Sequence, residues 1–225
     1  MEKPIVLSLG GSLIAPKDID ARFLRQFIAL VRAYAKRGCR FAIICGGGMT
    51  ARKYQQAAKK IARLDNEALD WVGIEATRLN AFLLMKLFRG DAEEAIIYDP
   101  SRPFRFKKGI VVASGWKPGR STDYDAVLIA KRLKADTIIN MSNIDHVYSA
   151  DPKTHRNARP LHSLSWKEYR RMAGNTWIAG LSLPFDPIAA KEAQASGMSV
   201  RIIGKDLRNF RDILNGGKWE GTVIS

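Results

Sequence analysis

Cysteine is nearly absent from this sequence, which limits the part that disulfides can play. The 225 residues include 2 cysteines, Cys39 and Cys45. The strand-like run that separates them would hold them roughly 20 Å apart at about 3.3 Å per residue, so we expect no bond between them. Cys45 precedes a glycine and is either a reactive thiol or a small apolar strand residue, and the second interpretation is favoured.

Histidine is also scarce, with 3 residues in the chain. His155 and His162 lie in a polar stretch and have no partner at the spacing that metal ligands use. We therefore expect surface histidines there rather than a metal site, and we assign no residue of the chain as a metal ligand.

Long apolar runs are missing as well. The longest apolar segments fall well short of the about 20 residues that a membrane-spanning helix needs. The N-terminus leads from Met1 to Pro4 straight into a strand-like run rather than into a signal peptide. We expect a cytoplasmic protein that does not enter membranes. Its length allows a single domain over residues 1–225 with one large core.

Acidic residues are few relative to basic ones. The chain has 22 Asp and Glu against 37 Lys and Arg, and its net charge of +15 attracts anions such as nucleotides or nucleic acid. One cluster combines Phe104 and Phe106 with Arg102, Arg105, Lys107 and Lys108. It either binds single-stranded nucleic acid through charge and stacking or forms a basic loop that its phenylalanines anchor. The second interpretation is favoured, because one short patch is a weak signal.

The chain is organised around residues 111–152. An apolar run at 111–113 is followed by a loop rich in glycine and hydroxyls at 115–122, a helical pattern through Leu133 and a second strand at 137–140. Such a βαβ unit produces a parallel sheet, and ligands bind at the carboxyl edge of these sheets. The two polar loops at that edge predict a site for two substrates.

Glycine-rich turns follow two further strand-like runs. Residues 5–9 lead into Gly10-Gly11-Ser12, and residues 41–45 lead into Gly46-Gly47-Gly48. Glycine lets backbone N–H groups approach an anion, and a helix that begins after such a turn favours phosphate at its N-terminus. The first pair alone is explained as well by a structural tight turn. Arg52, about one helical turn beyond the second run, would reach back over the same anion.

The rest of the chain alternates helical and strand patterns. Asp20 caps a helix that ends at Gly38, and residues 66–88 form a longer helix. Its apolar stripe comprises Leu69, Val72, Ala76, Leu79, Leu83 and Leu87. Asp70, beside the stripe, is either a solvated position or an acceptor of ribose hydroxyls. Further predicted strands are 95–98, 199–203 and 222–224, and further helices are 165–172 after the cap Ser165, 188–196 after the cap Asp186, and 207–214.

Several motifs together resemble one known family. They are LGGSLI at 9–14, CGGGMTARKY at 45–54, DWVGIEATRLNA at 70–81, WKPGRSTD at 116–123, NIDHVYSADP at 143–152, DPIAAKEA at 186–193 and GT near the end. In this order and over nearly the whole chain, they resemble the amino acid kinase superfamily, and most closely its uridylate (UMP) kinase members of the archaeal type. Several motifs in register are far more specific than any single glycine loop.

The resemblance implies a three-layer α/β/α sandwich around a mainly parallel sheet, usually assembled as a homohexamer. It implies transfer of the γ-phosphoryl group of ATP to UMP with Mg²⁺, a step of pyrimidine nucleotide biosynthesis. Residues 1–135 would form mainly the acceptor-binding part of the domain, and residues 136–225 the ATP-binding part. A nucleoside monophosphate is already ionised near neutral pH, so catalysis reduces to alignment and neutralisation of charge.

The resemblance also implies roles for individual residues, carried over by position. UMP would be bound by Gly47, Asp70, Trp116, Lys117, Pro118, Gly119, Arg120, Ser121 and Thr122. ATP would be bound by Gly11, Ser12, Gly48, Arg52, Ser142, Tyr148 and Asp151. The catalytic residues would be Lys191, which contacts phosphate, Asp123, which organises the cationic groups around the transferred phosphoryl, and Arg52.

Three positions depart from the pattern of this family. Ser8 stands where many members carry a lysine, so the positive charge would have to come from Arg52, Lys117 or Lys191. His146 replaces a glycine and is a less favourable residue if that position needs a positive φ. Arg120 stands in the UMP loop at a position often held by another polar residue, so the acceptor is specified less firmly than the reaction.

Two alternatives stay open at this point. A kinase of the same fold would act on another phosphate or carboxylate acceptor, although Asp70 and the hydroxyls of Ser121 and Thr122 favour a nucleotide. A non-catalytic nucleotide-binding or nucleic-acid-binding protein would explain both the charge of +15 and the missing lysine. Salt-dependent RNA binding without turnover would identify it.

Overall fold

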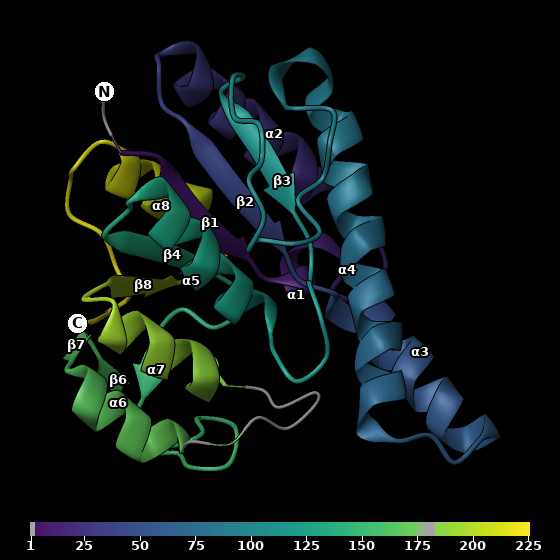
Figure 1. The fold of residues 1–225 in the computed structure, drawn as a ribbon. Coiled ribbons are helices and arrows are strands. Elements are labelled where there is room, and N and C mark those ends of the chain that lie inside the picture. The colour runs from purple at the N-terminus through teal and green to yellow at the C-terminus, as the bar shows by residue number, and fades with distance from the viewer. Residues whose placement is uncertain (1–2, 175, 177–182) are drawn as a thin grey trace.

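The computed structural model describes residues 3–174, 176 and 183–225 of the chain. Within this part, seven strands form one sheet in the order β3-β2-β1-β4-β8-β9-β7 (Figure 1). All neighbours in this sheet are parallel except β8 and β9. The strands are β1 (Ile5–Leu9), β2 (Phe41–Cys45), β3 (Ile110–Ala113), β4 (Thr137–Met141), β7 (Ser163–Leu164), β8 (Ser199–Ile203) and β9 (Thr222–Ile224). The predicted, mainly parallel sheet is confirmed.

Helices cover both faces of this sheet (Figure 1). One face carries α2 (Ala21–Lys36), α4 (Asn66–Phe88) and α8 (Leu207–Leu214), and the other carries α5 (Thr122–Leu133), α6 (Trp166–Ala173) and α7 (Pro187–Ala195). The remaining helical segments are α1 (Gly11–Ile14), α3 (Gly48–Ile61), which packs against α4, and η1 (Arg89–Asp91). The arrangement is the predicted three-layer α/β/α sandwich.

Alternation along the strands builds a separate core on each face. On β1, Leu7 and Leu9 belong to the core under α2, α4 and α8, whereas Val6 belongs to the core under α5, α6 and α7. Successive strand side chains point to opposite faces, so an unbroken apolar run such as Phe41–Cys45 is buried on both. The short apolar runs of the sequence become central strands for this reason.

A two-stranded ladder lies outside the main sheet. β5 (Val147–Tyr148) pairs antiparallel with β6 (Pro160–Leu161), with Val147 opposite Leu161. Thr222 of β9 holds this hairpin to the main sheet, because its hydroxyl accepts the Val147 N–H at 2.8 Å and donates to the carbonyl of Leu161. The polar stretch after β4 is thereby fixed to the C-terminal strand.

The predicted helix starts are confirmed by their caps. Asp20 accepts the N–H of Phe23 at 2.9 Å, and Asp186 accepts the N–H groups of the first turn of α7. Ser165 and Glu168 form a reciprocal capping box at the start of α6. These contacts are local in sequence, which is why the pattern of residues identifies them.

The strand predicted at residues 95–98 is wrong. The segment runs beside β3 but touches it only at two isolated bridges, Ala92 to Ile110 and Ile97 to Ala113. The first members of these bridges are five positions apart and the second members three, so the segment bulges away between them. Ile96 and Ile97 are buried, whereas Ala95 and Tyr98 are exposed, and no continuous ladder forms.

The apolar stripe predicted for α4 is also only partly correct. Leu69 and Ala76 are buried, but Leu79 is 61% exposed, and Ile74, Leu84 and Phe88 face the core instead. The helix is apolar on nearly all sides, so several stripes fit its sequence equally well. Packing of α4 against the sheet selects one of them and leaves a second apolar face outside.

Candidate functional site

The predicted loops meet at the carboxyl edge of the parallel strands. Gly10, directly after β1, donates its N–H to the last residue of β4 at 2.8 Å. Gly46, directly after β2, donates to the last residue of β1 at 2.9 Å. The hydroxyl of Ser12 reaches the Asn143 side-chain oxygen in the loop after β4 at 3.2 Å. The two glycine loops and the loop after β4 therefore lie side by side, as the βαβ pattern predicts.

The glycines of these loops fit against each other. A Cβ on Gly11 would lie 2.1 Å from the Gly48 nitrogen, and one on Gly48 would lie 2.2 Å from the Gly11 carbonyl oxygen. Gly48 also has a φ of +64°, which disfavours other residues. The structural explanation that the sequence left open for the first glycine pair therefore holds. The same close packing leaves the N-terminus of α3 without side chains that would shield it from an anion.

A cavity of about 200 Å³ opens between α3, α4 and the loop before α5. Five of the residues that the resemblance assigns to UMP line it, namely Gly47, Asp70, Arg120, Ser121 and Thr122. Gly48 and Arg52, which the resemblance assigns to ATP, line the same cavity. The cavity thus brings together five of the nine residues assigned to UMP, and residues of the two assigned sets meet at the start of α3.

The loop between β3 and α5 is held by three hydrogen bonds to side chains. The backbone N–H groups of Gly115 and Gly119 donate to Thr77 Oγ1 and to Asp70 Oδ2, each at 2.8 Å. The N–H of Trp116 donates to Asp125 Oδ2 at 3.1 Å. Asp70 therefore positions the loop across this cavity as well as lining it.

Cationic side chains of this loop lie over aromatic rings. Lys117 Nζ is 4.0 Å from the centre of the Trp116 ring, and the Arg120 guanidinium is 4.6 Å from the centre of the Tyr124 ring. Such cation–π contacts hold the charges near the cavity without neutralising them. Pro118, between the two cations, is partly buried.

A second cavity, of about 640 Å³, lies between α6 and the segment that follows β4. Tyr148 and Asp151 line it, and Tyr148 Oη donates to Asp145 Oδ1 at 2.9 Å. The other residues that the resemblance assigns to ATP, Gly11, Ser12 and Ser142, belong to the loops at the sheet edge. The predicted ATP residues are thus divided between this cavity and that edge.

Asp123 lies in the first turn of α5, where it faces the ends of β1 and β4. Ser8 Oγ and Asn140 Nδ2 donate to its Oδ1 at 2.9 and 2.8 Å, and the Asp186 N–H donates to its Oδ2 at 3.2 Å. Burial and the charge of Asp186 raise the pKa of Asp123 to about 7, although these hydrogen bonds oppose the shift. In the free protein, this carboxyl therefore titrates close to neutral pH.

Two further carboxylates lie close to Asp123. Burial raises the pKa of Asp125 to about 8, although the Trp116 N–H and the Arg120 charge lower it. Asp125 Oδ1 and Asp186 Oδ2 are buried and have no hydrogen-bond partner among the described residues. Unpartnered carboxylate oxygens are ligands that suit Mg²⁺, which keeps several waters and binds one or two carboxylates together with phosphates. The donor set here fits a Mg²⁺–nucleotide complex.

Cations are not placed directly on Asp123. Ser8 is buried and occupies the position of the missing lysine, and none of the ion pairs within the described residues includes Asp123. Arg52 on α3 and Lys191 on α7 are both exposed, and neither takes part in an ion pair among the described residues. Their charges are therefore not neutralised by the protein itself.

Sequence patterns alone did not identify four of these polar residues. In the sequence, Ser8 is notable only for the lysine that it replaces, and Asn140 only ends a strand. Asp186 is recognisable as a helix cap, and no pattern distinguishes Asp125. The signal that the sequence offers is a polar residue at an otherwise apolar strand end or a carboxylate in the first turn of a helix. Which of these residues meet depends on the fold.

His155 and His162 are exposed, as predicted, but the prediction that His162 has no partner at the spacing of metal ligands is wrong. The His162 and His146 rings are 5.3 Å apart between centres, so His162 does have a partner of the metal-ligand type. His146 is not among the residues with positive φ, so the replacement of glycine costs no backbone strain. The polar stretch is folded back by the β5–β6 ladder, which brings residues distant in sequence together.

For Cys45 and for the basic loop, the structure supports the favoured interpretations, a buried strand residue and a loop anchored by its phenylalanines. Cys45 is fully buried in β2, and burial raises the pKa of its thiol, so the alternative of a reactive thiol is wrong. Phe104 and Phe106 pack against the core under α5, which confirms that they anchor the loop.

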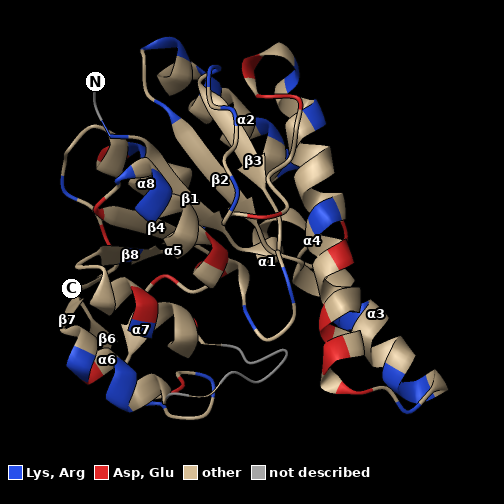
Figure 2. Cartoon of the chain, in the orientation of Figure 1, with Lys and Arg blue, Asp and Glu red and all other residues tan. Residues whose placement is uncertain are grey.

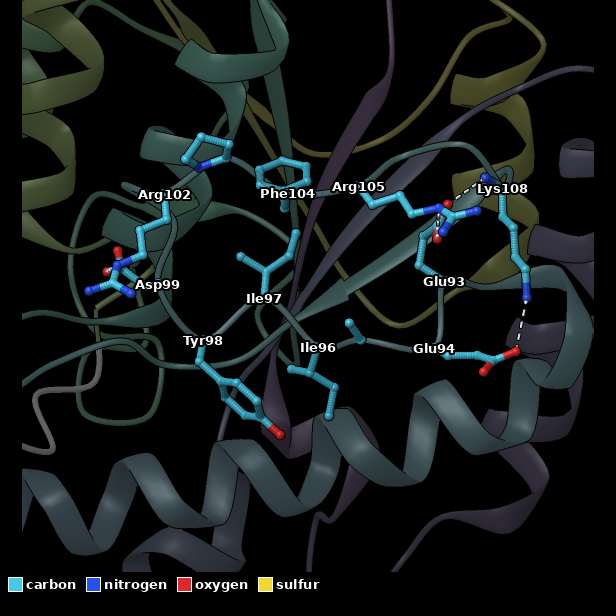
Figure 3. Close-up of a pocket in the computed structure, with 12 residues that line it drawn as sticks. Glu93, Glu94, Ile96, Ile97, Tyr98, Asp99, Arg102, Phe104, Arg105 and Lys108 are labelled. Carbon is cyan, nitrogen blue, oxygen red and sulfur yellow. Dashed lines mark hydrogen bonds and ion pairs between the residues drawn. The ribbon is translucent and has the colours of Figure 1, made fainter.

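Three of the four cations of the basic loop have acidic partners around a third cavity, of about 580 Å³ (Figure 3). The ion pairs are Arg102 with Asp99 at 3.2 Å, Arg105 with Glu93 at 3.5 Å and Lys108 with Glu94 at 3.5 Å. Glu93 is buried, which raises its pKa, but the N–H groups of Lys108 and Lys107 and the charge of Arg105 hold it below the usual value. Other Lys and Arg residues are distributed over α3, α4, α6 and α8 (Figure 2).

Comparisons with known proteins agree with this architecture. The sequence profile of the amino acid kinase family matches residues 3–204. A uridylate kinase of Thermoplasma volcanium is 34% identical over 96% of this chain and 95% of its own length. One from Pyrococcus abyssi is 35% identical over 98% of both chains. The uridylate kinase from Archaeoglobus fulgidus, whose crystal structure is known, is 31% identical in sequence, and its structure superposes over 100% of both chains with a TM-score of 0.84.

Among the described residues, no helix combines the length and apolarity that crossing a bilayer requires.

Proposed function

The chain belongs to the amino acid kinase family, and from this we propose that it is a uridylate kinase, which transfers the γ-phosphoryl group of ATP to UMP and releases ADP and UDP. One observation carries the proposal. The small cavity lined by Asp70, Arg52 and the loop before α5 opens at the same sheet edge as the loops that lead to the larger cavity of Tyr148. Relatives named uridylate kinase match nearly the whole chain.

UMP is proposed to occupy the smaller cavity. Its ribose hydroxyls would donate to Asp70, and its uracil edge would meet the loop from Trp116 to Thr122. Gly47 would offer its backbone N–H at the start of α3, where a helix N-terminus favours the phosphate. This assignment makes residues 1–135 the acceptor-binding part of the domain.

ATP is proposed to lie along the loop after β4, with its base in the larger cavity. Tyr148 and Asp151 would contact the nucleoside, and Ser142 would lie beside the phosphates. The phosphates would reach the glycine loops at Gly11, Ser12 and Gly48, which makes residues 136–225 the main ATP-binding part. Mg²⁺, when bound with ATP, would neutralise phosphate charge, and Asp125 and Asp186, each with a buried oxygen that has no partner among the described residues, are the residues that would hold it.

The chemistry needs alignment and positive charge more than a base. The phosphate oxygen of UMP is already ionised and attacks the γ-phosphorus directly, while the ADP oxygen leaves on the opposite side. Arg52 from α3 and Lys191 from α7 would approach the transferred group from two sides. Each such contact contributes about a hundredfold or more in rate. Asp123 would orient these cations, and Ser8 and Asn140 orient Asp123.

The direct test is phosphoryl transfer from ATP with Mg²⁺ to a panel of acceptors. UMP, CMP, dUMP, AMP and GMP are compared under identical conditions, and the products are separated by ion-exchange chromatography. Formation of UDP well above all other products is the expected result. Transfer only to another acceptor would move the chain to a different substrate within the family. No transfer to any acceptor, with salt-dependent RNA binding, would favour the non-catalytic alternative.

We further propose that the protein acts in the cytoplasm, in pyrimidine nucleotide biosynthesis, as a homo-oligomer, and as a hexamer in its full assembly. The second apolar face of α4 supports the oligomer. Leu79 is 61% exposed and Phe82 is 50% exposed, and Trp71 and Leu87 are exposed on the same helix. An exposed apolar surface of this kind on a folded domain indicates a protein contact. A second copy of the chain would cover it.

A further inference from the structure

Three side chains converge beside the C-terminal strand of the main sheet, and one of them, His146, also lines the larger cavity proposed for the ATP base. They are His146 after β4, His162 between β6 and β7, and Glu220 before β9. Each offers one ligand atom, and these atoms lie within 4.8 Å of one another. We propose that the three side chains form a binding site for a divalent transition-metal ion of the Zn²⁺ type.

The backbone positions of the two histidines are fixed by the strands. Because Val147 lies opposite Leu161 in the antiparallel β5–β6 ladder, the next pair outward is His146 and His162. The N–H of Val223 on β9 donates to the His162 carbonyl at 2.9 Å. His162 is thereby held between the hairpin and the main sheet.

Glu220 is fixed in a similar way from the other side. Its N–H donates to Asn209 Oδ1 at 2.8 Å, and its carbonyl accepts from Asn209 Nδ2 at 2.7 Å. Asn209 lies on α8, so the segment before β9 cannot drift away from the hairpin without breaking both bonds. All three ligand positions are therefore ordered before any ion arrives, which favours binding.

His146 supplies the second observation that points to a ligand. It is only 9% exposed, and neither of its ring nitrogens has a hydrogen-bond partner among the described residues. A buried polar group without a partner is unfavourable, and a bond to a metal ion removes that deficit. Asp145 Oδ2 lies 3.7 Å from His146 Nδ1, on the side where a carboxylate orients a ligating imidazole. That arrangement assigns Nε2 to the ion.

The donor set selects the kind of metal. Two imidazoles and one carboxylate, with water as a fourth ligand, suit Zn²⁺ and its neighbours rather than Mg²⁺, which prefers oxygen ligands alone. In a tetrahedral site with bonds of about 2.1 Å, ligand atoms lie about 3.4 Å apart. His162 and Glu220 are exposed, so rotation of their side chains closes the remaining distance without movement of the backbone.

An ion at this position would join three segments of the chain. It would clamp the loop after β4 to the β5–β6 hairpin and to the start of β9. His146 itself lines the larger cavity together with its neighbours Asp145 and Tyr148, so metal binding would also restrict that cavity. The site itself does not depend on the proposed kinase activity.

The test is a Co²⁺ titration of tag-free, nucleotide-free protein in excess Mg²⁺, followed by visible absorption, with Zn²⁺ as competitor. We expect one Co²⁺ per chain and ligand-field bands that Zn²⁺ abolishes. His162→Gln and Glu220→Gln should each weaken binding at least about tenfold. His155→Gln is the matched control, since His155 is an exposed histidine outside the cluster, and it should bind as the wild type does.

A second measurement separates loss of the ligand from loss of the fold. At a Zn²⁺ concentration about a hundredfold above Kd, the Tm of the wild type should rise by about 5–10 °C, and that of His162→Gln should not rise. Circular dichroism without metal should be the same for all variants, because the substituted side chains are exposed. Absence of stoichiometric binding overturns the proposal. So does binding that survives both ligand substitutions, or intense thiolate charge-transfer bands, which would place the ion at a cysteine.

Discussion

Ser8 Oγ donates a hydrogen bond to Asp123 Oδ1 at 2.9 Å, which joins the central strand to the first turn of α5. Ser8 is paired with Asn140 on β4, and Asn140 Nδ2 donates to the same oxygen at 2.8 Å. Neutral donors from two adjacent strands therefore hold the Asp123 carboxylate. The lysine that many members of the family carry at the position of Ser8 is absent. The ionisation of Asp123 in the free protein depends on these donors.

Ser8→Ala should raise the pKa of Asp123 further, since it removes a donor that favours the ionised form. If ionised Asp123 is required, the acidic limb of the kcat/KM profile should move to higher pH by about half a unit to one unit. Ser199→Ala is the control, because Ser199 is a strand serine paired with Thr137 at 2.9 Å, away from the site. An unmoved limb with normal binding of both substrates would contradict the role given to Asp123.

Asp123→Asn should change how stability depends on pH. The pKa of Asp123 is raised to about 7 in the folded protein, above its ordinary value near 3.8, so the folded state binds the proton more tightly than the unfolded state. The wild type therefore loses stability as pH rises from about 4 to about 7, and the variant lacks this loss. We expect the variant to gain about 1–3 kcal/mol relative to the wild type over that range, measured by urea unfolding. A constant difference across the range would show that Asp123 titrates normally.

Turnover of the Asp123→Asn variant should fall, while its affinity for both nucleotides is largely kept.

Much of the fold could be predicted from the sequence because its signals are local. Caps such as Asp20 and Asp186 bond to residues within three positions, and central strands are short apolar runs between turns. The segment at 95–98 could not be assigned in this way. Whether a strand forms there depends on its register with β3, which is set by residues far along the chain.

The parts of the candidate site that are formed by local motifs could be predicted from the sequence. Contacts between residues distant in sequence could not. The glycine loops and the loop before α5 were identified from composition and spacing. The contact between Asp123 and Asp186 spans 63 positions, and the His146–His162 pair depends on a two-residue ladder. No periodicity in the sequence encodes such contacts.

Asp70→Ala should weaken UMP binding more than ATP binding. The substitution removes the proposed acceptor of the ribose hydroxyls and the side chain that accepts the Gly119 N–H at 2.8 Å, so the loop over the smaller cavity loosens. We expect the KM for UMP to rise by about tenfold or more and the KM for ATP to change by less than about twofold. Glu67→Ala, an exposed carboxylate in the first turn of the same helix, serves as the control. Equal effects on both nucleotides would argue against the assignment.

Lys191→Ala should lower kcat about a hundredfold while the fold is preserved. Lys191 is exposed on α7, so its removal leaves no cavity and no buried partner. Lys167→Ala is the control, because it removes an exposed lysine from α6 and lowers the net charge by the same amount. It should leave kcat unchanged. Rates are measured at saturating concentrations of both nucleotides. If both lysine variants behave alike, Lys191 contributes only to the general field of the protein.

Phe82→Glu should lower the oligomeric state of the protein. Phe82 is 50% exposed on α4, next to Leu79, and an added carboxylate would be desolvated if a second copy of the chain covers this face. Light scattering coupled to size-exclusion chromatography should give a smaller mass than for the wild type, with unchanged circular dichroism. Gln56→Glu adds the same charge at an exposed position of α3 and should keep the wild-type mass. A wild-type mass for Phe82→Glu would mean that the contact between copies lies elsewhere, since a buried, unpaired carboxylate at an interface is not tolerated.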